Sequence, residues 1–184
     1  MIRPRTGANS RADRSGVGKV KCLPALGSTA QNGEVVELTS VLEELRILIE
    51  TTYHESEINV EWDLREPLPL VWADRYGLIQ VFLNLAKNSQ RAMMSSETKR
   101  LRILAEQENG KVVIRFEDTG MGVTSPEKLF QPFQTGAKSS GLGLYVSRVI
   151  MRSFGGDLSY EPRTQGSCFA AALRLAAAKE SAHA

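Results

Sequence analysis

The sequence has few of the residues that usually mark metal-binding, disulfide-linked or membrane proteins. Its only two cysteines, Cys22 and Cys168, share no short spacing, so neither a zinc site nor a disulfide framework is indicated. No apolar run approaches the roughly 18 residues that a membrane-spanning helix needs. The arginine-rich amino end carries no apolar stretch of the signal-peptide type. These absences favour a reduced, cytoplasmic setting.

The net charge of the chain is also small. Twenty-three Lys and Arg against 21 Asp and Glu leave a formal charge of +2, too little to predict binding to nucleic acid or a membrane surface. With 42% apolar and 24% charged residues, the 184-residue chain has the composition of a single globular domain. We expect a disordered tail or linker at 1–33, one domain at 34–176 and a second tail at 177–184.

Residue periodicity predicts both strands and helices. Asp74 is expected to cap a long helix, Asn109-Gly110 to form a tight hairpin turn, and Thr39 or Ser40 to cap the first helix. Antiparallel hairpins mixed with helices predict an α+β sandwich with helices on one side. Strands are predicted at 34–38, 58–64, 99–107, 111–118, 157–162 and 167–175, a short extended piece at 66–74, and helices at 39–54, 75–94 and 142–154.

The long helix carries a polar face. Asn84 and Asn88 lie one turn apart, and Lys87 and Arg91 flank them. Two amide oxygens beside two cations can organise a hydrated Mg²⁺ and a polyphosphate, because Mg²⁺ takes oxygen ligands and keeps water. The alternative is a polar stripe that faces solvent.

A strand followed by glycines forms the second candidate, "VVIRFEDTGMGV". The two-residue period places Asp118 on the same face as three apolar residues, at the end of the strand. A carboxylate buried there needs partners, and an adenine amino group is a suitable donor. Gly120 and Gly122 would allow another group to approach the backbone. The alternative is a turn in which Asp118 binds its own loop amides.

The third candidate is "AKSSGLGLYVSR", where a loop becomes a helix. Gly141 and Gly143 lie at the helix start, after Ser139 and Ser140, and Lys138 adds a positive charge. Backbone amides at a helix start bind anions, helped by the helix dipole. A Gly-x-Gly before a helix can instead be a simple hinge.

In their order and spacing, these segments resemble the ATP-binding domain of sensor histidine kinases, in the GHKL or Bergerat-fold family. "NLAKNSQRAM" is similar to the family's N box, "DTGMGV" to its first glycine box, "LFQPF" to its F box and "SSGLGLYVSR" to its second glycine box. "QGSCF" is similar to a Gly-Thr-x-Phe element, with Ser167 in place of threonine. The resemblance covers residues 34–175 and implies a two-layer α+β sandwich, with a mixed, mainly antiparallel sheet packed on three helices.

The resemblance implies a role for each matching position. Asn88, and less centrally Asn84, would coordinate an Mg²⁺ that bridges the phosphates of ATP, and Lys87 or Arg91 would contact phosphate oxygens. Asp118 would accept a hydrogen bond from the adenine amino group. The F box would anchor a mobile lid, and the second glycine box would present amides to the phosphates. The implied nucleotide-site residues are Asn84, Lys87, Asn88, Arg91, Asp118, Gly120, Met121, Gly122, Val123, Phe130, Phe133, Thr135, Lys138, Ser139, Ser140, Gly141, Leu142, Gly143, Leu144 and Ser167.

One position separates a kinase from a hydrolase. In the gyrase and heat-shock chaperone branches of this family, a glutamate four residues before the Mg²⁺ asparagine activates water. Here that residue is Asn84, whose amide cannot act as a base. We therefore expect a protein-histidine kinase domain that transfers the γ-phosphate. The alternatives are a GHKL protein-serine kinase of the anti-sigma-factor type, which often has glutamate at that position, and a module that binds ATP without transfer.

The acceptor histidine of this family lies upstream, on a dimeric helical hairpin. Residues 1–33 contain no histidine, and their glycines and prolines oppose a helical hairpin. His54, although followed by Glu55, falls inside the ATP-binding domain at a predicted helix end, where local capping is the simpler interpretation. We therefore expect no autophosphorylation by this chain alone. The expected partners are a histidine-containing dimerisation domain, missing here or supplied in trans, and a downstream response regulator.

Overall fold

The structure, a computed structural model, describes residues 33–132 and 142–177. The predicted tails at 1–33 and 177–184 lie outside these ranges except for Gly33 and Ala177, so the domain boundaries stay predictions. Within the described ranges, no helix is long and apolar enough to cross a membrane. The elements are β1 (Glu34–Val36), α1 (Leu38–Glu55), β2 (Asn59–Leu64), β3 (Val71–Ala73), α2 (Arg75–Met93), β4 (Arg100–Glu108), β5 (Lys111–Asp118), the 3₁₀ turn η1 (Pro126–Lys128), α3 (Gly143–Ser153), β6 (Asp157–Glu161) and β7 (Ser167–Leu175).

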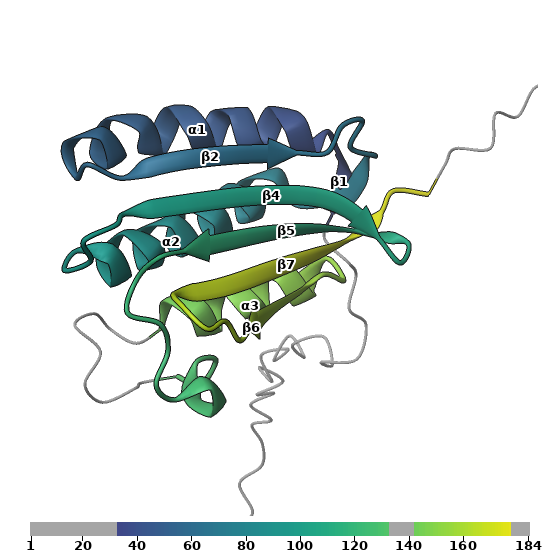
Figure 1. The fold of residues 1–184 in the computed structure, drawn as a ribbon. Helices are drawn as coiled ribbons and strands as arrows, with labels where there is room; N and C mark the ends of the chain where they lie inside the picture. Colours follow the sequence, from purple (N-terminus) through teal and green to yellow (C-terminus); the bar gives the residue numbers. More distant parts are fainter. Residues whose placement is uncertain (1–32, 133–141, 178–184) are drawn as a thin grey trace, which may run out of the picture.

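The strands form one mixed sheet in the order β1-β3-β7-β5-β4-β2 (Figure 1). Only the β2–β4 pair is parallel among the described strands, and every other pair is antiparallel. Strand β7 pairs with β5 along one edge, and on its other edge it pairs with β6 and then with β3. The predicted α+β class with a mainly antiparallel sheet is confirmed.

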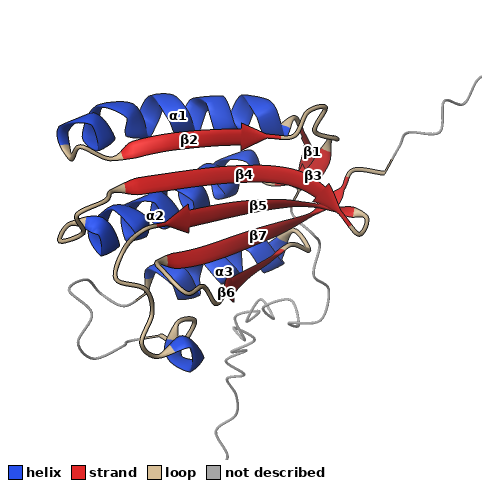
Figure 2. Ribbon diagram, in the orientation of Figure 1, coloured by secondary structure: helices blue, strands red, loops and turns tan. Residues whose placement is uncertain are grey.

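All three helices cover the same face of the sheet, as Figure 2 shows. This arrangement follows from the sequence periods, because α2 buries a helical stripe and β5 buries every second residue. The two stripes meet at Phe82 and Phe116, whose ring centroids lie 5.6 Å apart in a tilted contact. The hydrophobic core therefore lies between the sheet and the helices.

Two local predictions are confirmed and one is wrong. Asp74 is the N-cap of α2, and its carboxylate accepts a hydrogen bond from the Tyr76 amide at 3.1 Å. Asn109 and Gly110 have φ values of 47° and 74°, the left-handed pair that a tight hairpin turn requires. Neither Thr39 nor Ser40 caps α1, because that helix begins earlier, with Glu37 at the N-cap and no side-chain cap. The Ser40 hydroxyl donates instead to the Glu37 carbonyl.

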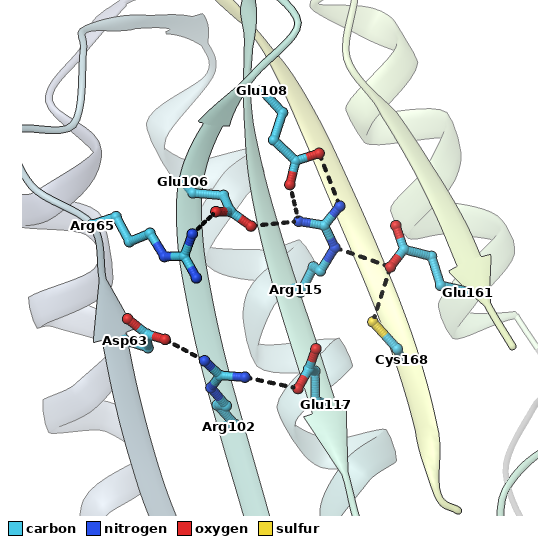
Figure 3. Close-up of polar contacts among 9 residues, drawn as sticks. All are labelled: Asp63, Arg65, Arg102, Glu106, Glu108, Arg115, Glu117, Glu161 and Cys168. Atoms are coloured by element: carbon cyan, nitrogen blue, oxygen red, sulfur yellow. Dashed lines mark hydrogen bonds and ion pairs between the residues drawn. The ribbon is translucent and has the colours of Figure 1, made fainter. Parts of the chain in front are cut away.

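The opposite face of the sheet carries a network of charged side chains (Figure 3). Arg115 on β5 pairs with three carboxylates, those of Glu106, Glu108 and Glu161. Glu161 also accepts a hydrogen bond from the thiol of Cys168, a residue that is only 1% exposed. A second group joins Arg102 to Asp63 and Glu117, and Arg65 pairs with Glu106.

Candidate functional site

The predicted site residues of the described ranges come from four segments that meet at one end of the sheet. Asp118 and Ser167 are register partners at the end of β5 and the start of β7. The middle of α2 packs against β5 and also against α3, so its asparagine face lies near both. Figure 1 shows the loop after β5 leaving the sheet at this end, with α3 behind β7 and β6. Four segments that are far apart in the chain, between residues 84 and 167, are thus neighbours in space.

The Asp118 carboxylate is buried, with only 3% of the residue exposed, and has three donors. Its Oδ1 accepts from the amides of Gly120 at 2.9 Å and Ser167 at 3.3 Å. Its Oδ2 accepts from the Ser167 hydroxyl at 2.5 Å. The turn interpretation was therefore right about the local Gly120 bond, but the carboxylate also holds β7. These donors fix its orientation and offset part of the free-energy cost of burying the charge.

Two hydroxyl groups on the helices are buried. The Tyr53 hydroxyl of α1 donates to the Ala86 carbonyl of α2 at 2.7 Å. Burial, and secondarily the negative charge of Asp118, raise the pKa of Tyr53 far above its usual value. One turn further along α2, the Ser89 hydroxyl is buried and has no partner within the described structure. An unpaired buried hydroxyl suits a site that a polar ligand or water completes.

The glycines of the first glycine box permit close packing. A Cβ added at Gly120 would lie 2.6 Å from the Cβ of Ala92 and 2.8 Å from its carbonyl carbon, so no larger residue fits. The following amide, of Met121, donates to the Ala92 carbonyl at 3.3 Å. Gly122 has a φ of 75°, in the region that favours glycine. The Met121 side chain is exposed, whereas Val123 packs against the core.

The polar face of α2 divides into two environments. Lys87 and Arg91 are exposed and Asn88 is half-buried. Asn84 lies instead at the joint with α3, where its Nδ2 donates to the Ser147 hydroxyl at 3.0 Å. A cleft of about 310 Å³ opens along this joint, lined from α2 by Gln80, Asn84 and Lys87 and from the start of α3 by Leu142, Gly143, Val146 and Ser147.

The start of α3 has no side-chain cap among the described residues. Leu142 is its N-cap and makes no side-chain cap hydrogen bond, and Leu144 packs against the core. Phe130 of the F box lies 4.7 Å beneath the guanidinium of Arg148, which also pairs with Asp157. The α3 helix therefore contacts both the F box and β6. The predicted site residues Phe133, Thr135, Lys138, Ser139, Ser140 and Gly141 lie outside the described residues.

The sequence interpretation did not identify four residues around the site. Ser89 directly follows Asn88, but its burial depends on how α2 rotates against the sheet. Ser147 lies one helical turn after Gly143, which is the only sequence signal for its contact with Asn84. Tyr53 lies outside every motif, and Arg148 ends the second glycine box but is given no role by the resemblance. His54 lies exposed in the last turn of α1, as predicted, next to buried Tyr53.

Comparison with known proteins assigns this architecture to a family. Residues 73–177, more than half of the chain, match the family described as histidine kinase-, DNA gyrase B-, and HSP90-like ATPase. The C4-dicarboxylate transport sensor protein DctB of Rhizobium meliloti is 33% identical over 106 residues, which are 56% of this chain and 17% of that protein. The signal transduction histidine-protein kinase AtoS of Escherichia coli is 32% identical over 127 residues, 67% of this chain and 21% of that protein.

Solved structures of histidine kinases have the same fold. The catalytic domain of histidine kinase ThkA matches with a TM-score of 0.69 at 28% identity, over 77% of this chain and 96% of that one. ThkA in complex with the response regulator protein TrrA matches with a TM-score of 0.66 at 25% identity, over 78% of this chain and 42% of that one. The chain thus spans nearly a whole solved catalytic domain but only 17% to 21% of the two curated sensor proteins. It belongs to the histidine kinase-, DNA gyrase B- and HSP90-like ATPase family and has the fold of the catalytic domain of two-component sensor histidine kinases.

Proposed function

We propose that this domain binds Mg-ATP and transfers the γ-phosphate to a histidine that a dimerisation domain supplies. The observation that supports this most strongly is the buried Asp118 carboxylate, which three donors from Gly120 and Ser167 hold in place. An oriented, buried carboxylate suits a ligand that presents an N–H donor, as the adenine amino group does.

The other end of the site suits phosphate and metal. The side-chain oxygen of Asn88 is a neutral oxygen ligand of the kind that Mg²⁺ accepts together with water and phosphate. Lys87 and Arg91 place two exposed positive charges on the same helix face. The first amides of α3 add donors and the positive end of the helix dipole. Bound Mg²⁺ would supply charge neutralisation on the phosphates, and these residues would orient them.

The side chain at position 84 supports transfer over hydrolysis. Asn84 is an amide, and its Nδ2 donates to Ser147, so this side chain neither removes a proton from water nor is free to orient one. Phosphate transfer to a nucleophile that another domain presents needs mainly positioning and charge neutralisation. We propose that a response regulator then accepts the phosphate from the histidine. The relative ThkA, solved in complex with the response regulator TrrA, supports this order of partners.

The test is transfer in trans. The chain is mixed with an isolated dimerisation domain of a sensor kinase, radiolabelled ATP and Mg²⁺, and the label on the dimerisation domain is followed. We expect label that is acid-labile and alkali-stable, as phosphohistidine is, and that disappears when the acceptor histidine is replaced. The Asp118→Asn variant serves as the nucleotide-site control.

The alternatives give different results in the same assay. Acid-stable label on a serine would identify a protein-serine kinase of the anti-sigma-factor type. Tight Mg-ATP binding without transfer to any dimerisation domain would identify a nucleotide-dependent binding module. Absence of nucleotide binding by calorimetry would contradict the proposal in all its forms.

A further inference from the structure

The joint between α2 and α3 contains a buried polar contact. Asn84 Nδ2 donates to the hydroxyl of Ser147, with a donor–acceptor distance of 3.0 Å. Ser147 is only 2% exposed, although it lies within five residues of the open start of α3. Among the described residues, this is the one side-chain hydrogen bond that joins the two helices. A hydroxyl buried at a helix joint depends on such a partner.

The other atom of the Asn84 amide also faces α3. A Cβ built on Gly143 would lie 2.5 Å from Asn84 Oδ1 and 3.1 Å from Nδ2. The Asn84 side chain therefore packs directly on the backbone of the first residue of α3, and only glycine leaves room for it. The Asn84 amide therefore lies against the start of α3, with Nδ2 hydrogen-bonded to Ser147.

The far half of α3 has different contacts with α2 and the sheet. Gly77 of α2 receives Ile150, since an added Cβ would lie 2.9 Å from its Cγ2. Met151 is fully buried, and Arg148 and Arg152 pair with Asp157 of β6. These contacts fix the middle and end of the helix, whereas the first turn has no side-chain cap. The Asn84–Ser147 hydrogen bond and the packing of Asn84 on Gly143 join the start of α3 to α2, and Leu144 packs on the core.

We propose that Asn84 is a positioning residue rather than a metal ligand. Through Ser147 and Gly143 it holds the amide-bearing start of α3 at the phosphate end of the nucleotide site. This inference rests on the proposed function, because it concerns the same nucleotide. It revises the less central metal role that the family resemblance implies for Asn84 and leaves Asn88 as the amide ligand of Mg²⁺.

The two roles predict different ligand dependence. A positioning residue acts on every ligand that uses the α3 amides, with or without metal, whereas a metal ligand acts only when Mg²⁺ is present. We therefore propose calorimetric titration of Asn84→Ala and Ser147→Ala with ADP and ATP, each with Mg²⁺ and with a chelator. Adenosine, titrated by NMR chemical shifts, reports on the Asp118 end alone.

We expect both variants to lower the affinity for ADP and ATP about tenfold, by the same factor with and without Mg²⁺. Their affinity for adenosine should stay within about twofold of that of the unmodified chain. The double variant should lose no more than either single variant, because both changes break one contact. Tyr76→Ala, at an 82% exposed position of α2 that does not line this cleft, should leave all affinities unchanged.

Three results would overturn the inference. These are a loss confined to the Mg²⁺ titrations, additive losses in the double variant, or an equal loss for adenosine. Asn84→Leu, which keeps the side-chain volume, replaces Asn84→Ala if the latter melts well below the parent. The proposed function has its own contradicting result, which is that the unmodified chain binds no nucleotide. A loss of affinity seen only with Mg²⁺, in a chain that binds ATP, contradicts the role of Asn84 alone.

Discussion

The Ser167 hydroxyl donates to the Asp118 carboxylate at 2.5 Å, across two strands that are in register at these residues. The contact joins the last residue of β5 to the first residue of β7. Because this contact forms together with the sheet, the carboxylate that we propose as the adenine acceptor is oriented before any ligand binds. We therefore expect position 167 to act on the proposed site through Asp118, by the hydroxyl that serine and threonine have in common.

Replacing Asp118 with asparagine should remove most of the affinity for ATP. The amide has half the acceptor capacity, and its NH₂ would face the donors of Gly120 and Ser167. We expect a loss of about 10- to 100-fold, the range of a hydrogen bond to a charged group, measured by calorimetry. Ser167→Ala is the matched variant and should lose less, because two backbone amides still hold the carboxylate. Unchanged ATP affinity in Asp118→Asn would show that the adenine does not bind there.

Replacing Asn88 with alanine should act through the metal. The variant loses a neutral oxygen ligand but no charge, so we expect ATP binding to fall several-fold in Mg²⁺ and hardly at all in a chelator. Calorimetry under the two conditions measures the difference. Arg91→Ala is the contrasting variant, since a lost phosphate contact weakens binding in both conditions. Equal losses for Asn88→Ala with and without the metal would rule out its role as a ligand.

Replacing Arg115 with methionine should destabilise the fold without a direct effect on the nucleotide site. The Arg115 side chain is 16% exposed and pairs with three carboxylates, which would then lie together without their shared cation. We expect a loss of about 1–3 kcal/mol in the free energy of unfolding by urea. Arg65→Met is the control, because that side chain is 59% exposed and has one partner, so its loss should stay below about 1 kcal/mol. Equal losses would mean that the network adds little.

Cys168 should resist thiol reagents until the sheet opens. Burial, and secondarily the charges of Glu161 and Glu117, raise the pKa of Cys168 to about 12, and the thiol donates to Glu161 at 3.5 Å. In a Cys22→Ser variant, we expect slow reaction with a disulfide reagent at pH 8 that becomes fast in denaturant. The urea concentration of that change should coincide with global unfolding by circular dichroism. Rapid labelling of the folded chain would contradict the burial of the thiol.

The contact between α3 and β6 should weaken in acid. Although burial raises it, hydrogen bonds from Arg148 and Arg152 lower the pKa of Asp157 to about 2, below its unfolded value. A lowered folded pKa gives stability that is present above the unfolded value near pH 4 and is lost as the pH falls toward 2. The unfolding free energy of Asp157→Asn should therefore approach that of the parent below about pH 3. A constant gap between the two across pH 2 to 6 would argue against this contribution.

Local chemistry explains why much of the fold could be predicted from sequence. Asp74 before an apolar period and Asn109-Gly110 between two alternating runs each have one favourable local structure. The start of the first helix was harder to predict. It lies at Leu38, a buried residue, and no capping side chain marks it. A serine or threonine near a helix start therefore predicts the first helical residue poorly when an apolar residue precedes it.

The site was predictable in its motifs but not in its contacts. The face that carries Asp118 followed from strand alternation, and its burial agrees. The partners of Asn84 depend on the crossing of α2 and α3, which no local pattern specifies. The ion pairs around Arg115 depend in the same way on strand order, since β4 and β6 lie on opposite sides of the β5–β7 pair.

The four segments of the site are far apart in the chain and adjacent only in the complete sheet. Asn84 and Ser147 are separated by 63 positions, and Asp118 and Ser167 by 49. Any ligand that contacts all of them therefore binds the folded state and has no partial site in the unfolded chain. Nucleotide at 100 times its dissociation constant would raise the free energy of unfolding by about 2.7 kcal/mol. With ATP as that ligand, as proposed, the resistance of this domain to unfolding would rise with the ATP concentration in the cell.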